Sequence, residues 1–387
     1  MSVTLRNLIQ KVRHMDIKLV AGAQGLDNDV SWIHMVESSP ATSFLDGGEL
    51  AITTGVGIGS DREFMDLITQ MYEHKVSGVI INIGPYLPTI PVEVTDFCDA
   101  HGLPLFRVPW KIHLSEIIRI MTYTITQEDR HQIESAALFE NAISFPDQEE
   151  LYAVSLRNHG YQASWSYTVC LVRPDAKTAS SGDELKKFIR PLNISLGHKW
   201  NQTCIFDLDG DIVFVLGNYD KDQVRAFVRD MQIALRSVFP TSYRPITGVG
   251  KTTQSIRCLY KSYRQASSVL RLQTNGKVSP DNIYYNDMGI YTLLMNITDR
   301  DVLTDFIENT LQPVIDYDEK NDTNLVQILR SYMKNNGSVQ ATADELFVHR
   351  NTVNYRLNKI KELTGMDLSA LDTRLKLGTA LMILDVI

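Results

Sequence analysis

Residues 338–362 read SVQATADELFVHRNTVNYRLNKIKE, and they decide the fold of the last part of the chain. A first short helix is predicted at about 339–346 and a second at about 350–363, each with apolar residues at helical spacing. Only residues 347–349 separate the two helices. Two short helices joined this tightly predict a helix-turn-helix.

The apolar residues of this stretch fall on the inner faces of the two helices. Ala343 and Leu346 face inward from the first helix, and the small side chain of Ala343 permits a close crossing. Val353, Leu357 and Ile360 face inward from the second helix, at the i, i+4, i+7 spacing of one helix face. These five residues are the predicted core of the motif.

The opposite face of the second helix is polar. Asparagine side chains can pair with adenine, arginine side chains can pair with guanine, and flanking cations can contact phosphates. A helical hairpin with only a structural role would need the same core, but not an outer face with a single acid, Glu362. We therefore predict that this helix binds DNA through Arg350, Asn351, Thr352, Asn354, Tyr355, Arg356, Asn358 and Lys359.

The distribution of charge supports this prediction, although the net charge does not. The 387 residues include 38 Lys and Arg against 46 Asp and Glu, a formal net charge of −8. Residues 324–387 hold 8 of the basic residues and 6 of the acidic ones, and four of the positive charges lie within residues 350–361. A mildly basic C-terminal region on an acidic remainder is typical of a DNA-binding domain attached to domains with other roles.

The first 125 or so residues alternate strand and helix patterns. Short apolar runs rich in β-branched residues occupy 49–54, 76–83 and 105–108, and amphipathic helices are predicted at 61–74 and 91–101. This alternation predicts an α/β domain with a parallel sheet.

A glycine-rich loop, GVGIG at residues 55–59, lies between a predicted strand and a predicted helix. Its spacing is not the G-x-G-x-x-G of a dinucleotide site, and a flexible connection would also explain it. Open α/β sheets nevertheless bind ligands at such loops. The residues that we predict to contact a small-molecule effector here are Glu49, Thr53, Thr54, Gly55 and Gly57.

The middle of the chain has a different order of predicted strands and helices. Residues 115–145 form a predicted long helix whose charged middle suggests a connector between domains, although the helix could equally fold onto its own domain. Between 147 and 273, strands and amphipathic helices indicate an α+β domain with antiparallel pairing, and Asp209-Gly210 marks a hairpin turn. Only helices are predicted after Asp299.

Catalytic and metal-binding motifs are weak. The sequence FDLDGD at 206–211 resembles the nucleophile loop of haloacid-dehalogenase phosphatases, with Asp207 and Asp209 as its acidic pair, but an equally apolar strand follows at once, as in a hairpin. Cys98 and His101 share a predicted helix but lack a third metal ligand. We therefore predict no catalytic residue, no metal site and no cofactor, and the protein is not expected to be an enzyme.

Cysteine spacing, the length of the apolar runs and the polarity of the first residues indicate the cellular compartment. The four cysteines lie far apart and form no C-x-x-C pair. No apolar run approaches the ~18–20 residues of a membrane span, and the polar start of the chain differs from a signal peptide. These features predict a cytoplasmic protein that does not associate with a membrane.

The sequence HRNTVNYRL at 349–357 resembles the H-R-N-T-[LV]-x-Y-R-L signature of PucR/CdaR-type bacterial transcriptional regulators, and the resemblance covers roughly the last 80 residues. Residues 47–55 and 100–109 resemble the PucR-type sensory domain. Residues 248–250 and 263–272 resemble the degenerate GGDEF-like domain of these regulators. No G-G-D-E-F motif is present, so the resemblance does not imply diguanylate cyclase activity.

Patterns and resemblance together predict a multidomain α/β and α+β chain. The expected parts are a PucR-like α/β effector-sensing domain at 1–125, a connector helix at 126–145, a degenerate GGDEF-like α+β domain at 146–290 and an all-α helix-turn-helix domain at 300–387. The resemblance implies a ligand-responsive activator of a catabolic operon for purine, amino-acid or sugar-acid use. Its expected partners are a double-stranded DNA operator and an unidentified small-molecule effector.

A homodimer or higher oligomer is also expected, because one helix-turn-helix reads only a few base pairs. Two alternatives stay open. The first is a phosphatase-like enzyme that uses the FDLDGD segment and has the tail as a recruitment module. The second is a binding protein whose tail contacts another protein instead of DNA.

Overall fold

The structure is a computed structural model that describes residues 3–174, 182–197, 199–240 and 244–387. The chain divides into two compact units. The first unit comprises residues up to 245 together with 252–262, and the second comprises residues 246–251 and 263–387. Among the described residues, no helix combines the length and the apolar character that crossing a bilayer requires.

The first unit begins with a five-stranded sheet in the order β1-β5-β4-β3-β2. Strands β2 to β5 are parallel to one another, and β1 is antiparallel to β5. The strands are β1 (Lys18–Ala21), β2 (Trp32–Met35), β3 (Glu49–Thr53), β4 (Gly78–Ile83) and β5 (Leu105–Pro109). The predicted parallel α/β sheet is confirmed, and β1 and β2 are additions that the sequence patterns missed.

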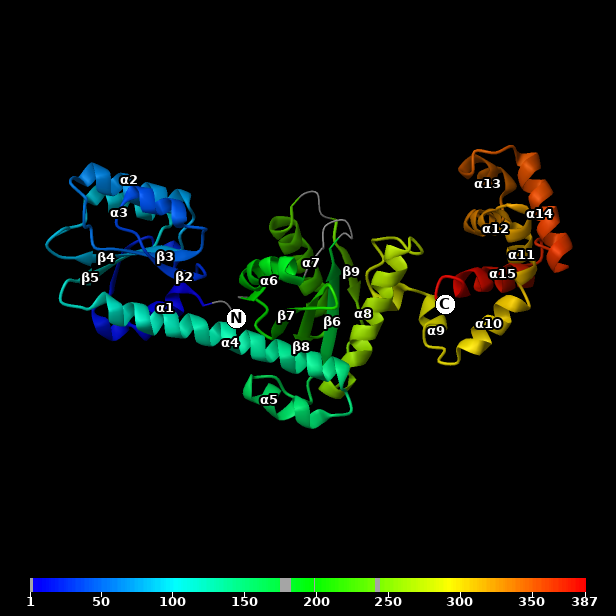
Figure 1. Cartoon of the computed structure of the whole chain (residues 1–387), viewed down its shortest axis with the longest axis horizontal. Helices are drawn as coiled ribbons and strands as arrows, with labels where there is room; N and C mark the ends of the chain where they lie inside the picture. Colours follow the sequence, from blue (N-terminus) through cyan, green and yellow to red (C-terminus); the bar gives the residue numbers. More distant parts are fainter. Residues whose placement is uncertain (1–2, 175–181, 198, 241–243) are drawn as a thin grey trace. The chain divides into compact units, whose positions relative to one another are not determined.

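Two layers of helices cover this sheet (Figure 1). Helices α2 (Asp61–Glu73) and α3 (Val92–His101) cover one face, and α1 (Leu5–Lys11) and the first half of α4 (Leu114–Ser144) cover the other. Alternate strand residues enter opposite cores: Ala51 lies in the core with α2 and α3, whereas Leu50 and Ile52 lie in the core with α1 and α4. Burial of both faces explains why β3 and β4 read as continuous apolar runs.

Helix α4 contributes to more than one apolar core. Its first half places Ile117, Met121 and Ile125 against the five-stranded sheet. Its second half buries Phe139, whose ring meets the ring of Tyr161 edge-on at a centroid distance of 4.8 Å. The predicted long helix is therefore confirmed, and both of its apolar ends are buried within the chain itself.

The middle of the first unit holds antiparallel strands, in which β8 pairs with both β6 and β7. The turn between β7 and β8 has positive φ at Asp209 (53°) and Gly210 (82°), the backbone of a tight hairpin, so the predicted hairpin is confirmed. The elements are α5 (Ala153–Asn158), β6 (Tyr167–Arg173), α6 (Gly182–Gly197), β7 (Thr203–Leu208), β8 (Asp211–Gly217) and α7 (Lys221–Val238).

The second unit is mainly helical, as predicted for the residues after Asp299. One apolar core runs from Val269 and Leu272 through every later helix to Val386. The elements are β9 (Ile246–Val249), α8 (Leu259–Thr274, which begins in the first unit), α9 (Tyr291–Leu294), α10 (Arg300–Glu308), α11 (Gln312–Asn321), α12 (Leu325–Lys334), α13 (Val339–Glu345), α14 (Arg350–Thr364) and α15 (Leu371–Ile383).

Asp385 is a buried carboxylate that fastens the end of the chain to this unit. Its side chain is 1% exposed and lies 2.8 Å from Lys277 Nζ and 3.0 Å from Arg330 Nη1, and it accepts a hydrogen bond of 2.7 Å from the Tyr291 hydroxyl. Burial alone would raise the pKa of this carboxyl, but the three donors outweigh burial and lower its pKa. The C-terminal residues are therefore part of the fold.

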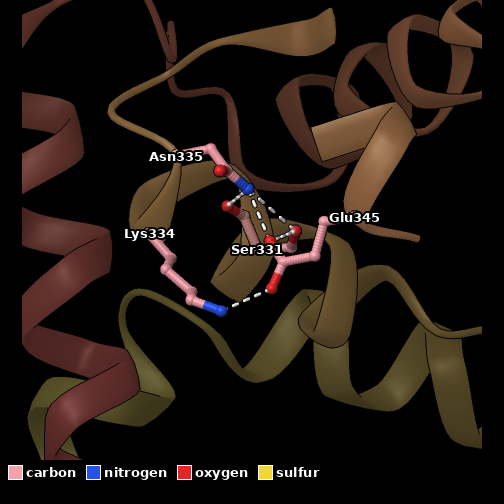
Figure 2. Close-up of polar contacts among 4 residues, drawn as sticks. All are labelled: Ser331, Lys334, Asn335 and Glu345. Carbon is pink, nitrogen blue, oxygen red and sulfur yellow. Dashed lines mark hydrogen bonds and ion pairs between the residues drawn. The ribbon is translucent and has the colours of Figure 1, made fainter. Parts of the chain in front are cut away.

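Glu345 performs a similar task between α12 and α13 (Figure 2). Its carboxylate accepts hydrogen bonds from Lys334 Nζ (2.6 Å), Ser331 Oγ (2.7 Å) and Asn335 Nδ2 (2.5 Å). These donors, of which Lys334 has the largest effect, lower the pKa of the Glu345 carboxyl to about 2. The contact fixes the first helix of the predicted helix-turn-helix on the helix that precedes it.

Replacing Asp385 by Asn should destabilise the second unit by about 2 kcal/mol, because Lys277 and Arg330 lose their shared anion while remaining partly buried. Hydrogen-exchange mass spectrometry of the full chain in increasing denaturant, followed on peptides from α12 and α15, measures this change. Glu319→Gln removes an exposed charge from α11 and serves as the control. Equal protection in both variants would contradict the structural role of Asp385.

Replacing Glu345 by Gln should speed hydrogen exchange in α13 at pH 7. The pKa of the carboxyl in the folded chain, about 2, lies below the ordinary value of 4.5, so its stabilising effect is present above pH 4.5 and is lost as the pH falls towards 2. The difference between wild type and Glu345→Gln should therefore shrink progressively below pH 4.5 and approach zero only below about pH 2. The neighbouring exposed acid offers a control, Asp344→Asn, and a pH-independent difference would refute the assignment.

Candidate nucleic-acid interface

The helix-turn-helix predicted from residues 338–362 is present as α13 and α14. The Ser338 side chain accepts a hydrogen bond from the backbone N–H of Ala341, and the His349 side chain accepts one from the N–H of Asn351, so each helix begins at a polar cap. The predicted core residues Ala343, Val353, Leu357 and Ile360 are buried, and Leu346 is half-buried against the same core. This packing fixes which side of α14 faces solvent.

The turn between the two helices has the backbone geometry that glycine usually provides. The N–H of Phe347 donates to the carbonyl of Asp344 (3.4 Å), and the N–H of Val348 donates to the carbonyl of Ala343 (3.0 Å), which is the Schellman pattern. Phe347 occupies the left-handed position with φ 54°, at a cost of about 1 kcal/mol for a residue with a side chain. The turn therefore has regular geometry although Phe replaces Gly.

Four exposed residues of α14 form one polar stripe, here called the recognition stripe: Asn351, Asn354, Tyr355 and Asn358. Their spacing of i, i+3, i+4, i+7 places them along a single side of the helix, opposite the buried face. Arg350 is also exposed and makes no ion pair within the residues that the structure describes. These five predicted residues are thus available to a partner.

The other three predicted residues are half-buried, and two of them, Arg356 and Lys359, already have partners. Arg356 Nη1 donates to Asn324 Oδ1 at 2.7 Å. Lys359 Nζ lies 3.1 Å from Glu362 Oε2 and 5.2 Å above the ring of Tyr317. Thr352 is half-buried without a comparable contact. The open polar groups are therefore concentrated in the first half of α14, the half that contacts base edges in helix-turn-helix proteins.

The residues predicted to bind an effector lie at both ends of β3. Thr53, Thr54 and Gly55 lie at the carboxyl end, where the Thr54 hydroxyl (2.8 Å) and the Thr53 hydroxyl (3.0 Å) donate to the carboxylate of Glu37, which follows β2. Glu49 lies at the other end, and its carboxylate accepts from the backbone N–H groups of the preceding turn. The structure therefore separates Glu49 from the other predicted residues and adds Glu37 to them.

The carboxyl end of this sheet is open and partly aromatic. Gly57 is exposed, and a Cβ atom there would meet nothing within 4 Å. Tyr86 and Trp110, which follow β4 and β5, are about half exposed and pack edge-on at a centroid distance of 5.8 Å. Loops after neighbouring parallel strands are the usual ligand site of an open α/β sheet. No motif in the sequence marked Glu37 or these two aromatic residues.

A second candidate pocket lies beside the second half of α4. It is a cavity of about 140 Å³ whose wall includes His131 and His159 (ring centroids 4.3 Å apart), Trp165 and Thr203. Burial, and then the neighbouring His159, lower the pKa of His131, so this imidazole is neutral near pH 7. Sequence reasoning did not find this cavity, because its wall is assembled from separate elements.

The phosphatase interpretation of FDLDGD has little structural support. Asp207 and Asp209 lie on the β7–β8 hairpin, whereas a phosphatase nucleophile lies on a loop after a parallel strand. Asp211, the last acid of the segment, is buried and paired with Arg173, whose Nε lies 2.7 Å from its carboxylate. The segment is thus built as a turn with a structural ion pair.

In the part of the chain that the structure describes, no group of three or more His, Cys, Asp or Glu side chains is placed to hold a metal ion. Cys98 is buried, which raises the pKa of its thiol to about 12, and the His101 ring packs against Tyr72 and Phe97. Burial also raises the pKa of Cys204 to about 12 and that of Cys170. Cys258 is the half-exposed one of the four free cysteines.

Known protein families match three segments of the chain. Residues 7–125 match the purine catabolism regulatory protein-like family, 146–272 match a GGDEF-like domain, and 325–383 match the PucR C-terminal helix-turn-helix domain. The last segment contains α12 to α15 and therefore the recognition stripe.

Characterised relatives are similar over different shares of the chain. The proline-responsive transcriptional activator PutR of Bacillus subtilis is 26% identical, with 72% of this chain and 68% of that protein covered. The purine catabolism regulatory protein of the same organism is 21% identical over 94% of this chain and 96% of that protein. The carbohydrate diacid regulator of Escherichia coli is 28% identical over 43% of this chain and 42% of that protein.

These matches agree with the α/β, α+β and helical parts of the fold. The chain therefore belongs to the PucR-type family of DNA-binding transcriptional regulators, with a PucR N-terminal domain, a GGDEF-like middle domain and a PucR C-terminal helix-turn-helix.

Proposed function

We propose that this regulator binds a double-stranded DNA operator through α14 and controls a catabolic operon in response to a small molecule. The observation that carries the proposal is the recognition stripe beside Arg350: exposed amide, phenol and guanidinium groups on a helix whose other side is locked into a core. Asparagine can pair with adenine and arginine with guanine in the major groove. Such a regulator would act in the cytoplasm, where bacterial DNA lies.

The proposal includes a homodimer or higher oligomer. One α14 reaches only a few base pairs, so useful selectivity needs two half-sites about one helical turn apart. An effector would act by favouring the arrangement of subunits in which the spacing of the two α14 helices fits the operator.

The class of effector is proposed from the relatives and from the first sheet. The relatives respond to proline or regulate purine or carbohydrate-diacid use, as their names state, so a purine, an amino acid or a sugar acid is the expected ligand and activation the expected response. We place the ligand at the carboxyl end of β3, beside Thr54, Gly55 and Gly57, with Glu37 and Trp110 as further walls. Glu49 would support this site only indirectly, through the turn before β3.

Replacing Arg350 by Ala should weaken binding to the operator by about tenfold to a hundredfold, because a paired base loses its donor, while binding to random DNA changes little. Tyr355→Ala should behave in the same way. Lys359→Ala should instead weaken both kinds of binding alike and lower the salt slope by about 1, as expected for a phosphate contact. Fluorescence anisotropy with the DNA upstream of the chain's own gene and with a scrambled duplex measures both.

Lys376→Ala is the matched control for these variants, since it removes an exposed cation from α15, away from the recognition stripe. If all three alanine variants lost affinity equally for the operator and for the scrambled duplex, the division between base and phosphate contacts would be contradicted. Operator affinity that is unchanged in Arg350→Ala would remove this residue from the interface. No binding of any duplex by the wild type would favour a tail that contacts protein.

A ligand that raises the melting temperature in a screen of purines, amino acids and sugar acids should also change tryptophan fluorescence. If it binds at the carboxyl end of β3, Trp110→Phe should abolish the change, because Trp110 is at that end of the sheet. Trp165→Phe is the control, because Trp165 lines the cavity beside α4. If only Trp165→Phe lost the ligand-induced fluorescence change, the effector would be assigned to that cavity instead.

A further inference from the structure

Phe347 is the one aromatic residue with left-handed backbone in the described part of the chain. The other non-glycine residues with positive φ in the described part of the chain are Asp16, Lys75, Asp209, Asn218, Asp322 and Asn336. Aspartate and asparagine tolerate this conformation because their short polar side chains can bond to the local backbone. The aromatic ring of Phe347 has no such means, so its conformation carries an uncompensated local cost.

Packing does not offset that cost within the chain. The side chain of Phe347 is 96% exposed, and no other large apolar side chain among the described residues is as exposed. Its neighbour Val348 packs against the core of the second unit, whereas Phe347 does not. Glycine at this Schellman position would avoid both the strain and the exposed ring.

The surroundings of the ring indicate what kind of group it could contact. Between residues 344 and 350, the other exposed residues are the polar Asp344, Glu345, His349 and Arg350, so Phe347 is the one exposed apolar side chain of this stretch. Protein-binding surfaces place several apolar residues together. A lone ring suits a small apolar group that is itself surrounded by polar atoms.

The thymine methyl group in the major groove of DNA has that character. Phe347 precedes Arg350 by three residues, and the first residues of a recognition helix lie against base edges. We propose that Phe347 contacts the C5-methyl group of a thymine at the edge of each half-site, and so makes the turn part of the DNA-reading surface. The proposal rests on the proposed function, because it assumes that α14 enters the major groove.

The test uses the full-length protein and a duplex that the wild type selects from a random-sequence pool. Each thymine of the selected site is replaced in turn by deoxyuridine, which removes one methyl group and keeps base pairing. At one thymine per half-site, the wild type should lose about fourfold in affinity, the loss expected for one methyl group. Phe347→Gly should bind the unmodified site about tenfold more weakly and should lose nothing further at that thymine.

Two more variants separate the ring from the backbone. Phe347→Asn keeps a residue suited to positive φ and should match Phe347→Gly, whereas Phe347→Leu should retain part of the methyl preference. The salt dependence of binding should be the same in all of them, since no phosphate contact changes. Phe347→Gly should melt at or above the wild-type temperature, which shows that weaker binding does not come from unfolding.

The outcomes are distinguishable. A wild type that selects no sequence would defeat the proposed function itself. A wild type that selects a site, loses affinity in Arg350→Ala, and shows the same deoxyuridine losses as Phe347→Gly would overturn the role of Phe347 alone. A change in oligomeric state in Phe347→Gly, with the thymine preference intact, would assign the ring to a protein contact and would also overturn the proposal.

Discussion

The burial of one face of α14 is the constraint on which the DNA-binding part of this regulator depends. A helix of 15 residues with so polar a sequence is marginal in water by itself. Val353, Leu357 and Ile360 anchor the helix in the core of the second unit. The recognition stripe, on the opposite side of the helix, is therefore exposed to solvent. Glu345 then holds α13, against which α14 packs, on α12. The side of α14 that we propose to contact DNA is thus opposite the side that stabilises the fold.

Much of the fold follows from short-range pattern. Strands β3 to β5 have apolar residues on both faces, so they read as runs between helices, and the hairpin at Asp209-Gly210 follows from turn chemistry. Strands β1 and β2 escaped prediction because they form the edges of the sheet. Most residues of β1 are exposed, and β2 exposes Trp32 and Met35, so neither has a buried period to detect.

The candidate sites were harder to predict because their contacts join distant segments. The sequence pattern grouped Arg356 and Lys359 with the other predicted DNA contacts, but Asn324 and Tyr317, which are distant in the sequence, engage them. Glu37 reaches Thr53 and Thr54 only because β2 and β3 pair in parallel, which no spacing in the sequence announces. Conversely, FDLDGD resembles a catalytic loop in its sequence but not in its structure. Asp209 lies in the hairpin turn, and Asp211 forms an ion pair with Arg173.

The cysteines have a practical consequence. Three thiols are buried and their raised pKa values keep them protonated at neutral pH, so a maleimide dye would react first with Cys258. That residue lies four positions before Ser262, the point in α8 where the first unit gives way to the second. The natural chain can therefore be labelled at a single site without mutagenesis, and the dye would report from beside a point at which the chain passes from the first unit to the second.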